Sequence, residues 1–191
     1  MTNPLPTRPW AGARLAAAHN YWLASTRPDG RPHLVPIWGV WIDERFWFAS
    51  FAGVKVDNVA AQPTVMLSTE TPGEVVILDG TCARVTEVDL PASYAKVFDE
   101  KYGPGWSGVG DAAAIHLRVV PAQIRAWHES EASSPPARFR FAAAEEASEL
   151  DRRRTLGTDL LGRLWATADL DPLEADALAA EAVRNTRRSP G

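Results

Sequence analysis

The sequence contains almost no cysteine, and this scarcity excludes two kinds of stabilising site. Only one of its 191 residues, Cys82, is a cysteine, so no disulfide can form within the chain. A metal site built from several cysteines is excluded for the same reason. We interpret Cys82, which lies among strand-like residues, as a small core residue.

Long apolar runs and an excess of basic residues are also missing. No apolar run approaches the roughly 18 residues that a membrane-spanning helix needs, so we expect no membrane partner. Charged residues make up 23% and the formal net charge is -4, whereas nucleic-acid-binding domains carry a basic excess. The first ten residues are proline-rich and lack the apolar core of a signal peptide, so we expect a cytoplasmic protein that binds no nucleic acid.

Standard catalytic motifs are absent as well. The sequence has no P-loop, no dinucleotide-binding glycine fingerprint and no Gly-x-Ser-x-Gly elbow. Its four histidines, His19, His33, His116 and His128, lack the spacing of metal ligands. We therefore predict no metal site and no catalytic side chain of a hydrolase.

Apolar and aromatic residues are plentiful. Hydrophobic residues make up 46% of the chain, which is enough for a sizeable core. Five of the eight tryptophans fall within the first 47 residues. This concentration indicates either an aromatic core or dimer interface, or a flat-sided pocket for a planar ligand.

Hydrophobic periodicity predicts an antiparallel meander followed by further strands and few helices. Gly80 is expected to mark a bend or a bulge, Pro36 an edge strand or a bulge, and Asp89 the N-cap of a helix. The run 33–42 is apolar on both faces, which predicts burial on both sides. We predict strands over 21–26, 33–42, 45–51, 64–69, 74–88, 114–120, 123–128 and 137–141, and helices over 8–20, 55–62 and 89–102. This order is typical of a β-barrel and not of a doubly wound sheet.

Composition changes after Phe141. Residues 142–191 are rich in Ala, Glu, Asp and Arg, and their leucines keep helical spacing. We therefore divide the chain into a barrel domain, 1–141, and a helical C-terminal extension, 142–191.

The segment WFASFAGVKVDNVAAQPTVMLST, residues 47–69, carries the main chemical signal. A strand ends, a glycine loop follows, and Lys55 opens a short helix. Backbone N–H groups at a helix start together with one lysine suit a phosphate, and Ser50 could add a hydroxyl donor. The alternative is a solvent-exposed lysine on a connecting helix, and the spacing alone leaves both readings open.

Three segments together resemble pyridoxamine 5'-phosphate oxidase and its relatives. The first is 47–69, with its strand–loop–Lys–short helix–Asn–Pro–strand pattern. The second is RPDGRPHLVPIWGVWIDERFWF, residues 27–48, and the third comprises Ile124–Trp127 and Arg138–Phe141. The resemblance covers about residues 15–141. It implies a mainly β fold, an antiparallel split β-barrel of the FMN-binding type, which forms a homodimer with its cofactor at the subunit interface.

The resemblance also assigns roles to single residues. Lys55, within the Lys–helix–Asn pattern that ends at Asn58, would grip the phosphate of FMN or of the deazaflavin F420. Ser50 and Phe51 would line the phosphate side. The ring or tail of the cofactor would be approached by His33, Val35, Pro36 and Trp38. Trp127 would come from near the dimer interface.

The chain departs from true pyridoxamine-phosphate oxidases where they carry cations. His33 and Trp38 stand in place of an arginine and a lysine, and Val54 in place of an arginine. The 133–136 region replaces the substrate-gripping Arg-x-His of those enzymes. Because an anionic substrate needs such cations, pyridoxamine phosphate is not the expected substrate.

These observations leave three functions open. The first is a flavin- or deazaflavin-dependent oxidoreductase that acts on a small, planar, hydrophobic substrate. The second is a non-catalytic protein of the same fold that binds a flavin or haem. The third is a barrel without cofactor that acts through protein contacts made by its helical C-terminal extension. The loop 103–110, with Tyr94 and Tyr102, is either a lid or a plain surface loop, and His128 is either a ligand donor or a surface residue.

Overall fold

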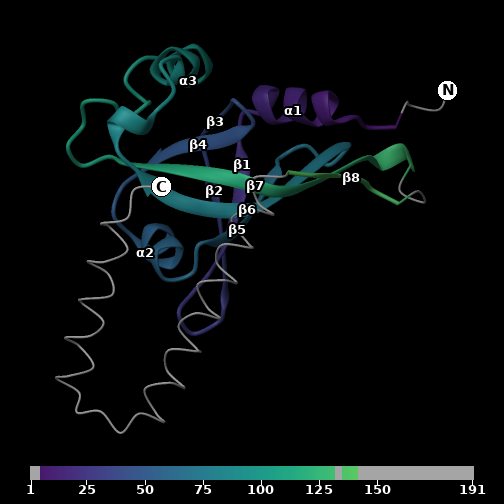
Figure 1. Cartoon of the computed structure of the whole chain (residues 1–191), viewed down its shortest axis with the longest axis horizontal. Coiled ribbons are helices and arrows are strands. Elements are labelled where there is room, and N and C mark those ends of the chain that lie inside the picture. The colour runs from purple at the N-terminus through teal and green to yellow at the C-terminus, as the bar shows by residue number, and fades with distance from the viewer. Residues whose placement is uncertain (1–4, 132–134, 142–191) are drawn as a thin grey trace, which may run out of the picture. The chain divides into compact units, whose positions relative to one another are not determined.

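The computed structural model describes residues 5–131 and 135–141. The predicted helical extension, 142–191, lies outside these residues. Within them the chain forms one eight-stranded sheet and three α-helices (Figure 1). The mainly β, antiparallel architecture predicted from the sequence is confirmed, and the sheet curls into the half-barrel of the split-barrel fold.

All neighbouring strands of the sheet are antiparallel. Their order is β2-β1-β5-β6-β7-β4-β3, and β8 also pairs with β7. The strands are β1 (Tyr21–Thr26), β2 (Pro32–Ile37), β3 (Val40–Ile42), β4 (Arg45–Ser50), β5 (Thr64–Thr69), β6 (Glu74–Val85), β7 (Ile115–His128) and β8 (Ala137–Arg140). The three helices are α1 (Arg8–Ala17), α2 (Val54–Ala61) and α3 (Tyr94–Tyr102), with 3₁₀ turns at Glu87–Asp89 and Glu129–Glu131.

The core fills the concave face of the curled sheet. Alternate residues of each strand point inward, as the period of two in a strand requires, and Leu23, Leu67 and Leu78 are fully buried there. Ala11 and Leu15 of α1 and Val56 and Val59 of α2 belong to the same cluster, so these helices close the open sides of the half-barrel. Cys82 is buried in this core, as predicted.

Helix α3 covers the outer face of β3 and β4. Trp47 points away from the main core and packs with Val40, Tyr94 and Phe98 in a second, smaller cluster. Figure 1 shows α1 and α3 on one side of the strands and α2 on the other. Among the described residues, α3 packs on β3 and β4, whereas the apolar side chains of Trp22, Leu34 and Met66 on β1, β2 and β5 stay exposed.

One predicted strand is divided. The run 33–42 forms β2 and β3, which are separated at Trp38 and Gly39. A Cβ at Gly39 would lie 2.4 Å from Cζ of Phe46, so the backbone turns against β4 at a point where only glycine fits. The expected burial on both faces is also wrong, because β2 is an edge strand whose residues Leu34 and Pro36 are exposed. The edge position predicted from Pro36 is confirmed.

Two predicted strands are fused instead. Strand β7 runs through Pro121, where a break was expected. The register with β6 shifts between Asp79 and Gly80, so Ala122 is left out of the ladder and the missing N–H of Pro121 is accommodated at a bulge. The bulge expected at Gly80 is thereby confirmed.

The start of α3 also differs from the prediction. Asp89 is not its N-cap. Its carboxylate instead accepts hydrogen bonds from the N–H and hydroxyl of Thr86 in a capping box around the 3₁₀ turn. Helix α3 begins at Tyr94, after Ser93. None of the helices described in residues 5–131 is long and apolar enough to span a membrane.

Candidate functional site

A hollow of about 300 Å³ lies where β2 faces the loop into α2. The loop supplies exposed backbone, and β2 supplies two side chains that lie two residues apart and therefore point to the same face. Its lining residues are His33, Val35, Phe51, Ala52, Gly53, Val54 and Lys55. Four of the predicted site residues, His33, Val35, Phe51 and Lys55, are therefore brought together.

Lys55 is the cation of this hollow. It occupies the second position of α2 and is half-buried, and this burial lowers the pKa of its ammonium group. Within the described residues, no hydrogen bond or ion pair engages that ammonium. A partly desolvated cation without a partner is stabilised by an anion placed beside it.

The loop before Lys55 leaves room for such an anion. Gly53 is the N-cap of α2, with φ 152° and ψ -178°, a backbone conformation that is essentially restricted to glycine. Gly53 has no side chain that could cap the helix, and a Cβ at this position would meet nothing within 4 Å. The N–H groups of Val56 and Asp57 already donate to the carbonyl of Gly53, so among the first amides of α2 those of Val54 and Lys55 are the ones that a bound anion could engage.

A chain of hydrogen bonds supports the β2 side of the hollow. The side-chain amide of Asn58, which is buried, donates to Oγ of Ser25 at 3.0 Å. Oγ of Ser25, also buried, lies 3.4 Å from Nδ1 of His33 on the facing strand. Asn58 therefore does not line the hollow and contacts it only through Ser25 and His33.

The remaining predicted site residues lie elsewhere. The hydroxyl of Ser50 donates to the carbonyl of Phe51 at 3.1 Å and does not line the hollow. Pro36 is exposed on β2, and Trp127 is half-buried on β7 opposite Val75 of β6. The indole of Trp38 donates to Oδ1 of Asn20 at 3.0 Å and stacks on Tyr102.

Trp38 belongs to an aromatic cluster that the sequence did not predict. Its ring lies 5.0 Å from that of Tyr102 at 13°, and 5.3 Å from that of Trp106 at 82°. His19 meets both Trp38 and Tyr102 edge-on. These residues come from three distant segments of the chain. Their contact depends on strand pairing and on the packing of α3, so their spacing along the sequence does not predict it.

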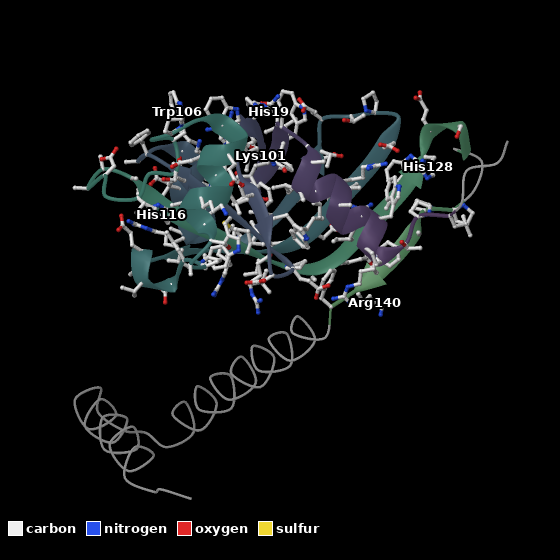
Figure 2. The ribbon with its side chains drawn as sticks, turned by 90° about the horizontal axis from the view of Figure 1, so that it is seen from above. His19, Lys101, Trp106, His116, His128 and Arg140 are labelled. Atoms are coloured by element: carbon white, nitrogen blue, oxygen red, sulfur yellow. The ribbon has the colours of Figure 1, made fainter. Side chains whose placement is uncertain are left out.

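Lys101 lies beside this cluster and differs from Lys55 in having partners. Its ammonium donates to the carbonyl of Ala16 at 3.0 Å, the hydroxyl of Tyr21 at 2.7 Å and the carbonyl of Gly39 at 3.1 Å. Burial lowers the pKa of Lys101 to about 8. Figure 2 shows His19, Lys101 and Trp106 gathered near α3, with His128 and Arg140 at the far end of the strands.

Hydrogen bonds attach the loop after α3 to the rest of the fold. The carbonyl of Ser107 accepts hydrogen bonds from the hydroxyl of Tyr94 at 3.1 Å and from Nε2 of His116 at 3.2 Å. Tyr94 is buried in the second cluster, where burial raises the pKa of its phenol. His128 is buried edge-on against Trp10 and is neither a surface residue nor close to the hollow.

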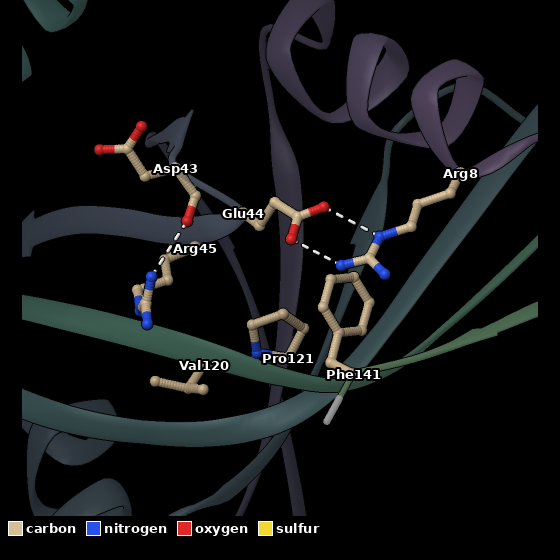
Figure 3. Close-up of a pocket in the computed structure, with 7 residues that line it drawn as sticks. All are labelled: Arg8, Asp43, Glu44, Arg45, Val120, Pro121 and Phe141. Atoms are coloured by element: carbon tan, nitrogen blue, oxygen red, sulfur yellow. Dashed lines mark hydrogen bonds and ion pairs between the residues drawn. The ribbon is translucent and has the colours of Figure 1, made fainter. Parts of the chain in front are cut away.

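A second hollow, of about 260 Å³, lies between α1 and the β3–β4 turn (Figure 3). Its two arginines, Arg8 and Arg45, already have partners, and Nε of Arg8 donates to Oε1 of Glu44 at 2.9 Å. The guanidinium of Arg8 also lies over the ring of Phe141, 4.1 Å from its centroid. Arg45 donates to the carbonyl of Asp43. The hollow at Lys55 is the better anion site, because its cation has no partner among the described residues.

Comparison with known proteins agrees with this fold. The model of the pyridoxamine 5'-phosphate oxidase family matches residues 11–145. No curated protein matches the chain. The chain belongs to the pyridoxamine 5'-phosphate oxidase family.

Solved structures share the fold at low sequence identity. A conserved hypothetical protein of Mycobacterium tuberculosis is 20% identical, with a TM-score of 0.57 over 71% of this chain and 92% of that one. General stress protein 26 of Bacillus anthracis is 12% identical, with a TM-score of 0.50 over 68% and 94%. The haem storage protein HutZ of Vibrio cholerae is 16% identical, with a TM-score of 0.51 over 60% and 89%.

Proposed function

We propose that the chain binds a flavin or deazaflavin cofactor, FMN or F420, with the cofactor phosphate beside Lys55 at the start of α2. The observation that carries this proposal is the half-buried ammonium of Lys55, which has no partner among the described residues. A phosphate would offset the cost of its burial and accept hydrogen bonds from the adjacent amides. Membership of the pyridoxamine 5'-phosphate oxidase family supports the same ligand class.

The proposed activity is hydride transfer to or from a small, planar, hydrophobic substrate. The cofactor would supply the redox chemistry, and the protein would bind and orient it. Val35 and Phe51 give the hollow apolar walls on which a flat ring can rest, and Lys55 fixes the phosphate end. Val54 stands beside Lys55 without a second cation, so we propose that pyridoxamine phosphate is not the substrate.

Non-catalytic binding of a flavin or haem is the second candidate. His33 is an imidazole on the wall of the hollow, and imidazole is a common axial ligand of haem iron. HutZ, which has a similar fold, is named as a haem storage protein. Mass spectrometry and the absorbance spectrum of the purified protein distinguish bound flavin, deazaflavin and haem. Substrate-dependent oxidation of the reduced cofactor distinguishes an enzyme from a carrier.

The test of the phosphate assignment is Lys55→Ala. Loss of one charge-assisted hydrogen bond should weaken FMN or F420 binding about tenfold to a hundredfold. Lys55→Arg should recover part of the affinity, because it keeps the charge and changes the geometry. Fluorescence titration measures the affinity, and thermal melts verify that both variants fold.

The matched control is Lys96→Ala, which removes an exposed lysine whose nearest partner is Glu100 on the same helix. This change should leave cofactor affinity as it is in the wild type. Equal affinity of wild type and Lys55→Ala for both cofactors would refute the phosphate assignment.

A further inference from the structure

The Asn58–Ser25 hydrogen bond leaves the hydroxyl hydrogen of Ser25 available to His33, and so bears on which ring nitrogen of His33 carries a proton. The amide nitrogen of Asn58 can only donate, so in its 3.0 Å contact Oγ of Ser25 is the acceptor. The hydroxyl hydrogen of Ser25 is then free to donate, and Nδ1 of His33 lies 3.4 Å away. A neutral imidazole that accepts at Nδ1 carries its hydrogen on Nε2.

Burial strengthens this assignment. Ser25 is 4% exposed and Asn58 1%, so neither side chain can exchange its partner for bulk water. The facing positions of Ser25 and His33 in the β1–β2 ladder hold the two side chains side by side. Within the described residues Nε2 of His33 has no hydrogen-bond partner, and its ring forms part of the wall of the hollow.

We propose that Asn58 and Ser25 are positioning residues that keep His33 as an Nε2–H donor toward an anionic ligand in the Lys55 hollow. The proposal rests on the proposed function and deepens it, because it gives the site a second donor opposite Lys55. A phosphate group then receives hydrogen bonds from two elements, α2 and β2. The ligand class is a phosphate ester, and the simplest probe of it is inorganic phosphate.

The first test observes the tautomer without any ligand. Protein labelled with ¹⁵N-histidine is studied at about pH 8.5, where an imidazole of ordinary pKa is neutral. Long-range ¹H–¹⁵N spectra distinguish protonated from unprotonated ring nitrogens, and His33→Gln identifies the signals of His33 by their loss. We expect the Nε2–H form in the wild type and a mixture of tautomers in Ser25→Ala, with the other three histidines unchanged.

A substitution at Asn58, the first donor in the Asn58–Ser25–His33 series of hydrogen bonds, should reverse the tautomer of His33. In Asn58→Asp the carboxylate accepts the hydroxyl hydrogen of Ser25, so His33 must donate from Nδ1 and leave Nε2 bare. Thermal melts verify folding, and if this buried substitution unfolds the protein, Ser25→Ala carries the test alone. An Nδ1–H form in the wild type, or a His33 signal that Ser25→Ala leaves unmoved, would overturn the proposal.

The second test measures binding of inorganic phosphate and of FMN by titration calorimetry. His33→Phe should lose about tenfold in affinity, and Ser25→Ala about twofold to fivefold. His33→Gln should keep most of the affinity, because its amide nitrogen stands close to the position of Nε2. Ser107→Ala removes another buried serine, which does not line the hollow, and should change neither affinity nor the His33 signals.

The outcomes separate this proposal from the broader one. If Lys55→Ala weakens binding while His33→Phe and Ser25→Ala do not, the second donor is refuted and the cofactor site stands. If no variant alters binding while the tautomer responds as expected, the Asn58–Ser25–His33 hydrogen bonds have no role in ligand binding. The phosphate assignment is then refuted as well.

Discussion

Two half-buried lysines of this chain show how partners, not burial alone, decide what a residue does. Lys101 donates to three oxygen atoms of the fold, so its hydrogen bonds connect α1, β1 and the β2–β3 junction. Lys55 has no partner among the described residues, although burial lowers the pKa of both. Lys101 therefore has a structural role, whereas Lys55 is available to a ligand.

Gly80 has a role that a single added methyl group should reveal. A Cβ there would lie 2.4 Å from the carbonyl oxygen of Val120, which is backbone and cannot move freely. We expect Gly80→Ala to lower the free energy of unfolding by about 1–3 kcal/mol, as overpacking does. Urea denaturation measures the change.

Gly73→Ala is the matched control for Gly80→Ala, because its Cβ would meet nothing closer than Oε2 of Glu129 at 3.9 Å. It should change stability by less than about 0.5 kcal/mol. Similar effects of both substitutions would show that loss of chain flexibility, and not the close contact at the bulge, determines the result.

At the scale of elements, α3 is anchored to the rest of the fold through polar contacts as well as packing. The hydroxyl of Tyr102 donates to the carbonyl of His19 or of Gly39 and accepts from the N–H of Gly39, and Lys101 adds three donations of its own. Burial raises the pKa of Tyr102 to about 12, so this phenol stays neutral at physiological pH.

The lowered pKa of Lys101 predicts a pH dependence of stability. Its pKa is about 8 in the folded protein, whereas that of an unperturbed lysine is 10.5, so the folded state binds fewer protons than the unfolded chain between these values. The contribution of Lys101 to stability should therefore be complete above about pH 10.5 and be lost as pH falls through about 8. Between pH 7 and 10 the stability of the wild type should rise relative to Lys101→Met.

Chemical denaturation of wild type and Lys101→Met at several pH values measures this difference. Other groups, among them the tyrosines with raised pKa values, titrate in both proteins, so only the difference reports on Lys101. A difference that stays constant or shrinks as pH rises would contradict the predicted shift.

Local signals predicted most elements, and long-range contacts account for the errors. The turn that joins the predicted strands 33–42 and 45–51 forms at Asp43 and Glu44, with φ of 51° and 54°, and the bulge at Gly80 was visible as a glycine inside a strand. The division between β2 and β3 depends on the ring of Phe46 against Gly39, and the continuity of β7 depends on the register of β6. Neither can be read from local propensity.

The candidate site was predictable in the same uneven way. Lys55 follows from the loop motif, and Phe51, His33 and Val35 follow from the family resemblance. The bond from Asn58 to Ser25 was not expected, because Ser25 carried no signal of its own in the sequence. The use of Trp38 in an aromatic cluster with Tyr102 and Trp106 was equally invisible, since it depends on where α3 packs.

At the scale of the whole molecule, the uncovered outer face of β1, β2 and β5 is the main exposed apolar surface that the described strands offer. Trp22, Leu34 and Met66 are 45%, 60% and 40% exposed there. Leu34 and Met66 both pair with Ala24, so the three strands place these side chains on one continuous face. Apolar faces of this kind mark sites of association.

We propose that this face contributes to a homodimer. Light scattering after size-exclusion chromatography should give a dimer for the wild type at micromolar concentration. Trp22→Glu should shift it to the monomer, because a charge at the centre of an apolar contact is costly to desolvate. Val88→Glu, at a site within the 3₁₀ turn Glu87–Asp89 that is 91% exposed, should remain dimeric. A monomeric wild type, or a dimeric Trp22→Glu, would contradict the proposal.

Strand β7 has a consequence for how the chain acquires its fold during synthesis. Residues 46–50 of β4 pair with residues 115–119 of β7, and β6 pairs with β7 along its whole length. Translation proceeds from the N-terminus, so β4 leaves the ribosome before β7 has been synthesised. One edge of β4 is therefore unpaired during this time. The aromatic residues of β4 therefore stay exposed in the nascent chain until β7 has been synthesised. Unpaired strands are prone to aggregation, so we expect the chain to be most vulnerable to aggregation in this interval.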